Sequence, residues 1–271
     1  MPHAKVNGVE LYYERHGDDG EPLVLVHGYT GDITDWRYQV EEFGRTHRVL
    51  VFDHRGHGRS EAPADRSLYS IQRMADDAEA LAGHAGFDRY HLVGHSMGGA
   101  VAQEIALRSQ RRLLSLTLHD TSPNFTLSRD ERVVKFIAAR NILAEQHGME
   151  AVANMPALTQ PPPFMSQERM EEQKARLARM SVDGYLGAWS ALDQWPGVRD
   201  RLHEIAVPTL VIYGELDTYL VRAAKQLAEG IPTATLVEIP QAAHSPQEER
   251  PDLFNAALRE HLLRASQSPP K

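Results

Sequence analysis

A serine in a glycine-rich segment is the residue of this chain best suited to covalent chemistry. Residues 94–99 read Gly-His-Ser-Met-Gly-Gly, match G-x-S-x-G and directly follow the apolar run 90–93. In such a pattern a strand turns sharply into a helix, and the serine sits at the tip of the turn in a strained backbone conformation with an exposed hydroxyl. We therefore predict that Ser96 is a nucleophile.

A serine hydroxyl attacks efficiently only when a neighbouring base accepts its proton and a third group orients that base. The chain offers His244 as the base, in the loop that follows the β-rich run 234–239. Asp217 is the preferred acid, because it lies in a loop directly after the strand-like run 208–213. Loops beyond the carboxyl ends of parallel strands form the ligand crevice of an open α/β sheet, so these side chains can meet there.

Two more loops follow predicted strands. Residues 27–31, His-Gly-Tyr-Thr-Gly, come after the apolar strand 23–26 and can aim the backbone N–H of Tyr29 at a substrate carbonyl. The N–H of Met97, next to the nucleophile, would be the second donor of an oxyanion hole. Residues 53–60 follow another predicted strand and complete the set of motifs.

With these motifs in this order, the chain resembles the α/β-hydrolase superfamily, and within it the small serine carboxylesterase and lactonase branch. The resemblance covers nearly the whole chain except its middle and implies a mostly parallel eight-stranded sheet flanked by helices, with a helical cap inserted after strand 6. Relatives that dehalogenate haloalkanes or hydrolyse epoxides carry Asp at the elbow, and Ser96 argues against both. Hydroxynitrile lyases and some cofactor-free oxygenases keep the triad, so the motifs do not remove them.

The resemblance also leaves alternatives for the acid. Some family members place it after the strand equivalent to 113–119, which makes Asp120 a rival of Asp217, and Glu215 is a weaker one. The G-x-x-D context favours Asp217. Many relatives have Gly before the catalytic histidine, where this chain has Ala243.

Composition agrees with one large α/β domain. The 271 residues are 42% hydrophobic and carry a net charge of −8, which argues against nucleic acid as a partner. Cysteine is absent, so neither a disulfide framework nor a thiolate metal site is expected. No signal peptide or membrane span is visible, and we expect a cytoplasmic location without membrane association. The sequence does not specify an oligomeric state.

The elements that must position these residues alternate along the chain. Val6-Asn7-Gly8-Val9 predicts a hairpin turn. The pattern then predicts strands at 10–14, 23–26, 48–52, 90–94, 113–119, 208–213 and 234–239, and helices near 34–44, 70–85, 97–109, 219–229 and 248–263. This alternation favours a parallel sheet covered on both faces. We expect the last residues, 266–271, to be frayed.

The alternation is interrupted between about residues 122 and 201, where helical patterns at 132–146 and 166–180 flank Pro161-Pro162-Pro163. From the resemblance we assign 122–201 to the cap, and 1–121 with 202–271 to the core domain. Candidates for an apolar substrate wall are Phe125, Phe136, Ile137, Met155, Leu158, Phe164, Met165, Tyr185, Trp189 and Leu192. Outside the cap, Tyr29 and Trp36 could contact substrate or simply pack.

Several charged or ring side chains have plainer interpretations. His27 and His95 are expected to be structural neighbours of the oxyanion loop and the serine. Asp53 is expected to fix the following loop through backbone hydrogen bonds; it forms no recognisable zinc spacing with His54 and His57, and no metal is predicted. The charged tract 168–174 is expected to be a solvated helix face.

These residues predict cofactor-free acyl transfer to water on a small-molecule ester or lactone. Carboxylesterase activity is the first hypothesis, and hydrolysis of acyl-homoserine lactones or enol-lactones is the second. Thioester hydrolysis, C–C bond hydrolysis and perhydrolysis stay open on the same scaffold. A ligand-binding sensor with a slow triad is a hypothesis of a different class.

Overall fold

The computed structural model describes residues 2–125, 131–155 and 165–267. For residues 131–133 it describes the backbone only. Its sheet contains β1 (His3–Val6), β2 (Val9–His16), β3 (Pro22–Val26), β4 (Arg48–Phe52), β5 (Tyr90–His95), β6 (Leu113–His119), β7 (Thr209–Gly214) and β8 (Ala234–Ile239). The α-helices are α1 (Arg37–Phe43), α2 (Ile71–His84), α3 (Met97–Ser109), α4 (Glu131–Ala153), α5 (Gln167–Arg179), α6 (Val182–Asp193), α7 (Val221–Gly230), α8 (Pro246–Glu249) and α9 (Pro251–Gln267). Short 3₁₀ turns are η1 (Ile33–Trp36), η2 (Arg66–Leu68), η3 (Gln110–Arg112) and η5 (Arg199–Glu204).

The strand order is β1-β2-β4-β3-β5-β6-β7-β8, with β1 and β2 antiparallel and the strands from β4 to β8 parallel. The chain therefore reverses its direction of travel across the sheet between β3 and β5. At such a switch point the loops leaving the two strands diverge, and a crevice forms outside the carboxyl ends. This topology confirms the predicted fold, a mostly parallel eight-stranded sheet flanked by helices.

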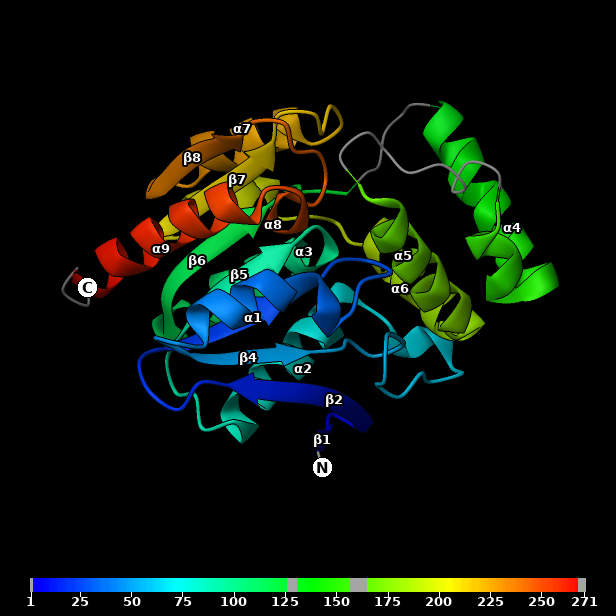
Figure 1. Cartoon of the computed structure of the whole chain (residues 1–271), viewed down its shortest axis with the longest axis horizontal. Coiled ribbons are helices and arrows are strands. Elements are labelled where there is room, and N and C mark those ends of the chain that lie inside the picture. The colour runs from blue at the N-terminus through cyan, green and yellow to red at the C-terminus, as the bar shows by residue number, and fades with distance from the viewer. Residues whose placement is uncertain (1, 126–130, 156–164, 268–271) are drawn as a thin grey trace.

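Two apolar clusters cover the two faces of the sheet. Because side chains alternate along a strand, Val24 and Val26 of β3 face one cluster, with residues of α2, α3 and α7, while Leu23 and Leu25 face the other. The second cluster includes Phe254 of α9 and lies under α1 and α9, which cross the front of the sheet in Figure 1. The central strands β3 and β5 are buried on both sides, as expected for a parallel sheet.

Helices α4, α5 and α6 lie between β6 and β7 in the sequence and project beyond one end of the sheet (Figure 1). They share a small apolar core that includes Met149, Leu177 and Leu186. This helical insertion after β6 confirms the predicted cap, while the domain boundaries at residues 122 and 201 stay a prediction.

The last predicted helix differs from the structure in one respect. It is divided into α8 and α9 at Arg250, which has an extended φ of −138°. Pro251 follows, and a proline disfavours helical backbone at the residue before it and lacks an N–H for the helix ladder. Helix α9 continues to Gln267, so residues 266 and 267 are helical, whereas the rest of the predicted frayed tail lies outside the described residues.

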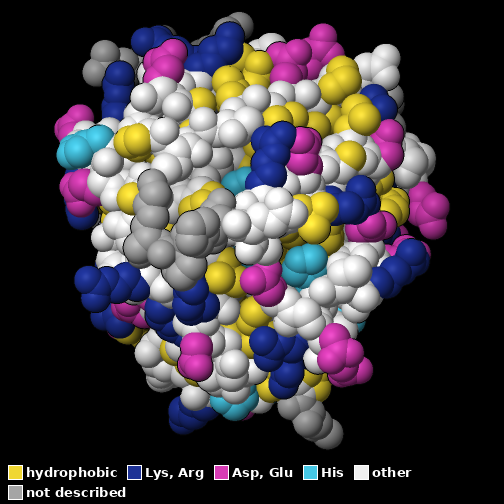
Figure 2. Space-filling model, turned by 90° about the vertical axis from the view of Figure 1, so that its left-hand side faces the viewer, with side chains coloured by type: hydrophobic (Ala, Val, Ile, Leu, Met, Phe, Trp, Pro, Cys, Tyr) yellow, Lys and Arg dark blue, Asp and Glu magenta, His cyan; other side chains and the backbone are white. Residues whose placement is uncertain are grey.

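Figure 2 shows the side of the molecule away from the cap, the left-hand side of Figure 1. Lys and Arg side chains are interspersed there with Asp and Glu side chains, and apolar side chains are scattered between them. Because charges of both signs are interspersed, this face has no strong electrostatic field of one sign.

Candidate active site

Ser96 lies at the turn between β5 and α3 with φ of 50° and ψ of −114°. Left-handed φ values are strained for residues other than glycine, and here the surrounding bonds hold the turn. The Ser96 N–H donates to the His119 carbonyl at 3.1 Å, and the Thr121 hydroxyl donates to the Ser96 carbonyl at 2.7 Å. A Cβ on Gly98 would lie 2.3 Å from the Val26 carbonyl oxygen, so a glycine there lets α3 approach the end of β3.

Three side chains predicted to act together are in contact. His244 Nε2 is 3.1 Å from Ser96 Oγ, and His244 Nδ1 is 2.7 Å from Asp217 Oδ2. Burial raises the pKa of Asp217, but the hydrogen bond and charge of His244 outweigh burial and leave this pKa below its ordinary value. Asp217 is therefore an anion at neutral pH, and it faces the ring nitrogen opposite the serine.

The two rival acids occupy other positions. Glu215 Oε2 accepts the Gln241 N–H at 2.9 Å, so its carboxylate is committed to the neighbouring loop. Asp120 is fully buried, and its Oδ1 accepts the Gly214 N–H at 3.0 Å. Of the three candidate acids, Asp217 is the one whose carboxylate is hydrogen-bonded to His244.

The loop after β3 runs beside the elbow. A Cβ on Gly28 would lie 3.1 Å from the Cβ of Ser96, a contact so tight that a larger residue would require the elbow to shift by a few tenths of an ångström. The Gly31 N–H donates to the Gly28 carbonyl at 3.1 Å and closes the turn. The Thr30 N–H donates to His57 Nε2 at 3.3 Å. The loop thus runs past the serine with its backbone fixed on both sides of Tyr29.

Met97 is the first residue of α3. The first N–H groups of a helix have no acceptor within the helix, and they lie at the positive end of its dipole. The Met97 N–H is therefore free, by helix geometry, to bind an oxygen anion next to Ser96. Its side chain is fully buried in the first apolar cluster, which fixes the backbone position.

Buried histidines support the loop after β3, and His27 has the structural role that the sequence predicted. Its Nδ1 donates to the Gly28 carbonyl at 2.8 Å, and its Nε2 accepts the His54 N–H at 3.0 Å. Burial holds the pKa of His27 and of His54 well below the ordinary histidine value, so both rings are neutral. Their role is to fix the backbone of two loops relative to each other.

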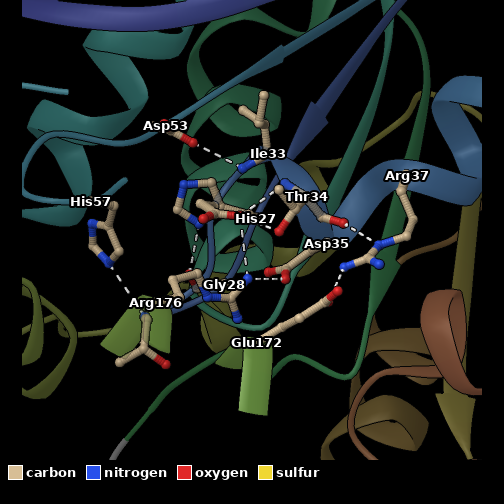
Figure 3. Close-up of polar contacts among 12 residues, drawn as sticks. His27, Gly28, Ile33, Thr34, Asp35, Arg37, Asp53, His57, Glu172 and Arg176 are labelled. Carbon is tan, nitrogen blue, oxygen red and sulfur yellow. Dashed lines mark hydrogen bonds and ion pairs between the residues drawn. The ribbon is translucent and has the colours of Figure 1, made fainter. Parts of the chain in front are cut away.

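Asp53 fixes the loop that follows β4, as predicted. Its Oδ2 accepts the Arg59 N–H at 2.8 Å, and its Oδ1 accepts the Ile33 N–H at 2.8 Å. Figure 3 shows the contact with Ile33. Burial raises the pKa of Asp53 to about 6, although these backbone hydrogen bonds oppose the rise.

The loop carrying His244 is held by two groups. Glu249 of α8 accepts the N–H groups on either side of the histidine, that of Ala243 at 2.5 Å and that of Ser245 at 3.3 Å. His95 Nε2 donates to the His244 carbonyl at 2.8 Å. Sequence reasoning missed Glu249, whose only signal was a carboxylate within about one helical turn after the predicted base.

Aromatic rings border the loop after β3 on the cap side. Tyr29 lies 5.3 Å from the Tyr185 ring and 5.8 Å from the Trp189 ring, centroid to centroid. The Tyr29 hydroxyl also donates to the Tyr185 carbonyl at 3.1 Å. Helix α6 thus brings Tyr185 and Trp189 beside the loop after β3, and their contact with substrate stays a prediction.

Other candidates for the substrate wall have different surroundings. Phe125 is buried in the first apolar cluster, 6.1 Å from the Trp195 ring. Phe136 is partly exposed on α4, with the Arg140 guanidinium 5.6 Å from its ring. Leu158 and Phe164 lie outside the described residues.

Trp36 requires a correction. Its side chain is completely buried in the second apolar cluster, beneath the sheet face that α1 and α9 cover, and its ring packs edge-on against His119 at 5.5 Å. An indole enclosed on every side has no surface left for a substrate. Trp36 is therefore a packing residue, the plainer of the two interpretations that its sequence context allowed.

The charged tract 168–174 also requires a correction, because one of its side chains faces the core. Arg169 is only 14% exposed and pairs with Asp35 at 3.0 Å and with Glu248 of α8. Arg176, about two turns further along α5, binds the same Asp35 oxygen at 2.5 Å. Figure 3 shows this second pair, together with the more exposed pair of Arg37 and Glu172. Charges therefore fasten the cap to the core.

A cavity of about 340 Å³ lies beside the histidine loop, between α5 and α8. Its lining includes Met165, one of the predicted wall residues, together with Arg169, Ser245 and Glu249. A larger cavity of about 640 Å³ follows the other side of α5, where Arg37 and Arg176 contribute to its wall. The seam between cap and core is thus hollow on both sides of α5.

The chain belongs to the alpha/beta hydrolase family, whose model matches residues 23–257. It is an enzyme of the hydrolase class, in the branch that holds esterases and lactonases. A putative carbamate hydrolase RutD of Azorhizobium caulinodans is 33% identical over 271 residues, covering 95% of this chain and 97% of that protein.

Two solved structures are similar over nearly the whole chain. The enol-lactonase from Burkholderia xenovorans LB400 aligns with a TM-score of 0.86 and 29% identity, covering 97% of this chain and 100% of that chain. A thermophilic esterase from Thermogutta terrifontis aligns with a TM-score of 0.82 and 29% identity, covering 98% and 97%. In the described part of this chain, no helix is both long and apolar enough to cross a membrane.

Proposed function

We propose that this protein is a serine hydrolase that cleaves carboxylic esters through an acyl-enzyme intermediate. The observation that carries the proposal is the continuous contact from Asp217 through His244 to Ser96, with distances of 2.7 and 3.1 Å. A serine held this way loses its proton to the imidazole as it attacks, and the carboxylate orients the ring and stabilises the imidazolium.

The first step forms a bond between Ser96 Oγ and the substrate carbonyl carbon, while the hydroxyl proton moves to His244 Nε2. The carbonyl oxygen becomes an anion, and the N–H groups of Tyr29 and Met97 are the proposed donors that bind it. Each such donor is worth on the order of 3 kcal/mol in the transition state. The alcohol then leaves with the proton from His244, and the acyl group stays on the serine.

In the second step water gives a proton to His244 and attacks the acyl carbon, which releases the acid and restores the serine. With a lactone the alcohol stays attached, and the product is a single hydroxy acid. Neither step needs a cofactor. The half-exposed side chain of His244, 48% accessible, supports this proposal because both the leaving alcohol and the incoming water must reach it.

The rings of Tyr29, Tyr185 and Trp189 are the proposed wall for the apolar part of the substrate. Phe125 and Phe136 are weaker candidates, because one is buried in the core and the other lies on the outer part of α4. A wall supplied largely by the cap would let cap sequence determine acyl and alcohol preference without altering the catalytic residues.

Lactone hydrolysis is the second candidate, and the close similarity to the enol-lactonase fold favours it. A carbamate also presents an ester-type carbonyl to the serine, so the relation to a putative carbamate hydrolase makes carbamates worth testing. A sensor that retains the triad would bind ligand tightly and turn over slowly. A cytoplasmic location stays a prediction.

The test is multiple-turnover hydrolysis of p-nitrophenyl esters from acetyl to dodecanoyl, beside a homoserine-lactone series, an enol-lactone and an alkyl carbamate. We expect rapid ester turnover that Ser96→Ala abolishes, with the variant still folded by circular dichroism. Higher kcat/KM on one lactone series would favour the lactonase. Tight binding with negligible turnover of every class by folded wild-type protein would contradict the proposal and favour the sensor.

A further inference from the structure

A second buried carboxyl group lies beside the proposed catalytic acid. Asp120, at the end of β6, is completely buried, and one of its oxygens, one oxygen of Asp217 and a ring nitrogen of His244 all lie within 4.8 Å of one another. The carboxyl groups of Asp120 and Asp217 are therefore neighbours in one site. The proposed mechanism uses one of these acids and leaves the other without a role.

The backbone holds Asp120 in this place at some cost. Its φ is 44°, in the left-handed region that few residues other than glycine, asparagine and aspartate adopt. Its N–H donates to the Ile212 carbonyl at 3.1 Å, and its Oδ1 accepts the Gly214 N–H at 3.0 Å. Asp217 in turn donates its N–H to the Gly214 carbonyl at 3.0 Å. Asp120 therefore ties the end of β6 to the start of the acid-bearing loop.

The charges around Asp120 do not stabilise an anion. The titratable groups that face it are Asp217 from the loop after β7, Glu249 of α8, the neighbouring His119 and His244. Among the described residues, no lysine or arginine pairs with it. His119 is 3.4 Å away, but burial keeps the pKa of that ring well below its ordinary value, so the ring is neutral.

Two carboxyl groups that share a buried site cannot both ionise easily, and the environment decides which keeps the proton. Asp217 has the hydrogen bond and charge of His244, which favour its anion. Burial raises the pKa of Asp120 well above its ordinary value, and the charge of Asp217 adds to the rise. The proton of the pair therefore belongs on Asp120.

We propose that Asp120 is a neutral positioning residue of the active site, which donates its O–H to the Asp217 carboxylate while its other oxygen accepts the Gly214 N–H. In this arrangement both oxygens of Asp120 are satisfied, and Asp217 is held by a donor on each side, Asp120 and His244. The carboxylate is thereby fixed in the orientation that aims His244 Nε2 at Ser96. The catalytic consequence rests on the proposed serine hydrolase mechanism, whereas the protonation state does not.

Asp120→Asn and Asp120→Gly form the matched pair of variants, because both residues accept the left-handed backbone. Asparagine keeps one acceptor and offers an N–H donor in place of the O–H, so we expect kcat within a few-fold of wild type. Glycine removes both contacts, and we expect kcat to fall by about tenfold or more, the effect of losing a hydrogen bond to a charged group. Urea unfolding of both variants controls for stability.

The pH dependence of kcat/KM separates this role from a merely structural one. Without the donor, the negative charge of Asp217 is concentrated toward His244, so the acid limb of the Asp120→Gly profile should move to higher pH, while that of Asp120→Asn should not move. If Asp120 were an anion, Asp120→Asn would remove a negative charge, lower kcat strongly and move the acid limb to lower pH. That result would overturn the proposal.

A direct readout does not depend on turnover. The infrared difference spectrum of wild type minus Asp120→Asn at neutral pH should contain the carbonyl band of a protonated carboxylic acid. A carboxylate band in its place would overturn the proposal even if both proteins were inactive on every ester. Loss of activity with EDTA and recovery with a divalent cation would also overturn it, because a cation rather than a proton would then neutralise the pair.

Discussion

At the residue scale, Ser96, Asp217 and His244 come from three different loops, and two contacts join them. Two of these loops are held by a side chain that sequence reasoning did not assign to them: Glu249 binds the histidine loop, and Asp120 binds the acid loop. The chemistry of such a site depends on orientation within tenths of an ångström, which the supporting groups supply.

Replacement of the acid is the sharpest test at this scale. Asp217→Asn keeps the size of the side chain but favours the wrong tautomer of His244, and we expect kcat to fall about 10⁴-fold with a smaller change in KM. Glu215→Gln is the control, because its carboxylate binds the Gln241 N–H, and it should remain active. An active Asp217→Asn with an inactive Asp120→Asn would reassign the acid to Asp120.

At the scale of elements, the buried carboxylate of Asp35 binds two arginines of α5. Asp35 is 6% exposed, and it accepts from Arg169 and Arg176, which are 14% and 12% exposed. Its pKa is below the ordinary value even though burial raises it, because the charge of Arg176 dominates among the opposing interactions. The anion therefore stabilises the folded state above the ordinary aspartate pKa, and this contribution is lost as the pH falls through the lowered pKa.

We expect Asp35→Asn to be more damaging than Arg176→Ala, because it removes the one anion that Arg169 and Arg176 share and leaves them only their separate partners, Glu248 and Asp32. Removing one partner of a buried ion pair costs about 3–5 kcal/mol. Urea unfolding measures this cost, and hydrogen exchange shows whether α5 loses protection first. The double variant should lose less than the sum of the two single losses.

Arg45→Ala breaks an exposed pair with Glu41, whose side chains are 70% and 73% accessible, and serves as the control with little expected change. Equal destabilisation by Asp35→Asn and Arg45→Ala would contradict the role given to the buried charges. Unchanged exchange in α5 with a large global loss would show that Asp35 stabilises the core rather than the attachment of the cap.

At the scale of the whole molecule, the protein encloses many neutral histidines. Burial lowers the pKa of His57, His95 and His261 to about 4, and it lowers the pKa of other buried rings as well. Between pH 6.5 and about 4 the unfolded chain binds protons that the folded protein excludes. The stability that these neutral histidines contribute is therefore fully present above pH 6.5 and is lost as the pH falls through this window.

Each of these histidines contributes a slope of about 1.4 kcal/mol per pH unit in that window. Asp53 and Glu248 act in the opposite sense, because burial raises their pKa to about 6 and about 7. Burial also raises the pKa of Asp120 and Glu249, but the buried histidines outnumber these four carboxyl groups. We expect the urea midpoint to decrease markedly from pH 7 to pH 5. His57→Gln, which keeps the Thr30 contact without titrating, should flatten the dependence; a midpoint independent of pH would contradict this account.

The sequence alone determined the parts of this protein that depend on local pattern. Alternating apolar runs placed the strands to within a residue or two, Asn7-Gly8 placed the hairpin turn, and the glycines around Ser96 identified the elbow. The order of the motifs indicated which loops would meet, because parallel strands end at one edge of a sheet.

Tertiary structure decided what depends on packing between distant segments. Trp36 is a core residue because α1 and α9 enclose it, and Arg169 faces inward because Asp35 lies beneath α5. The protonation of Asp120 depends on the closeness of Asp217, almost a hundred residues away in the chain. A local pattern contains no distances of this kind, and burial, ion pairing and proton affinity are all properties of distance.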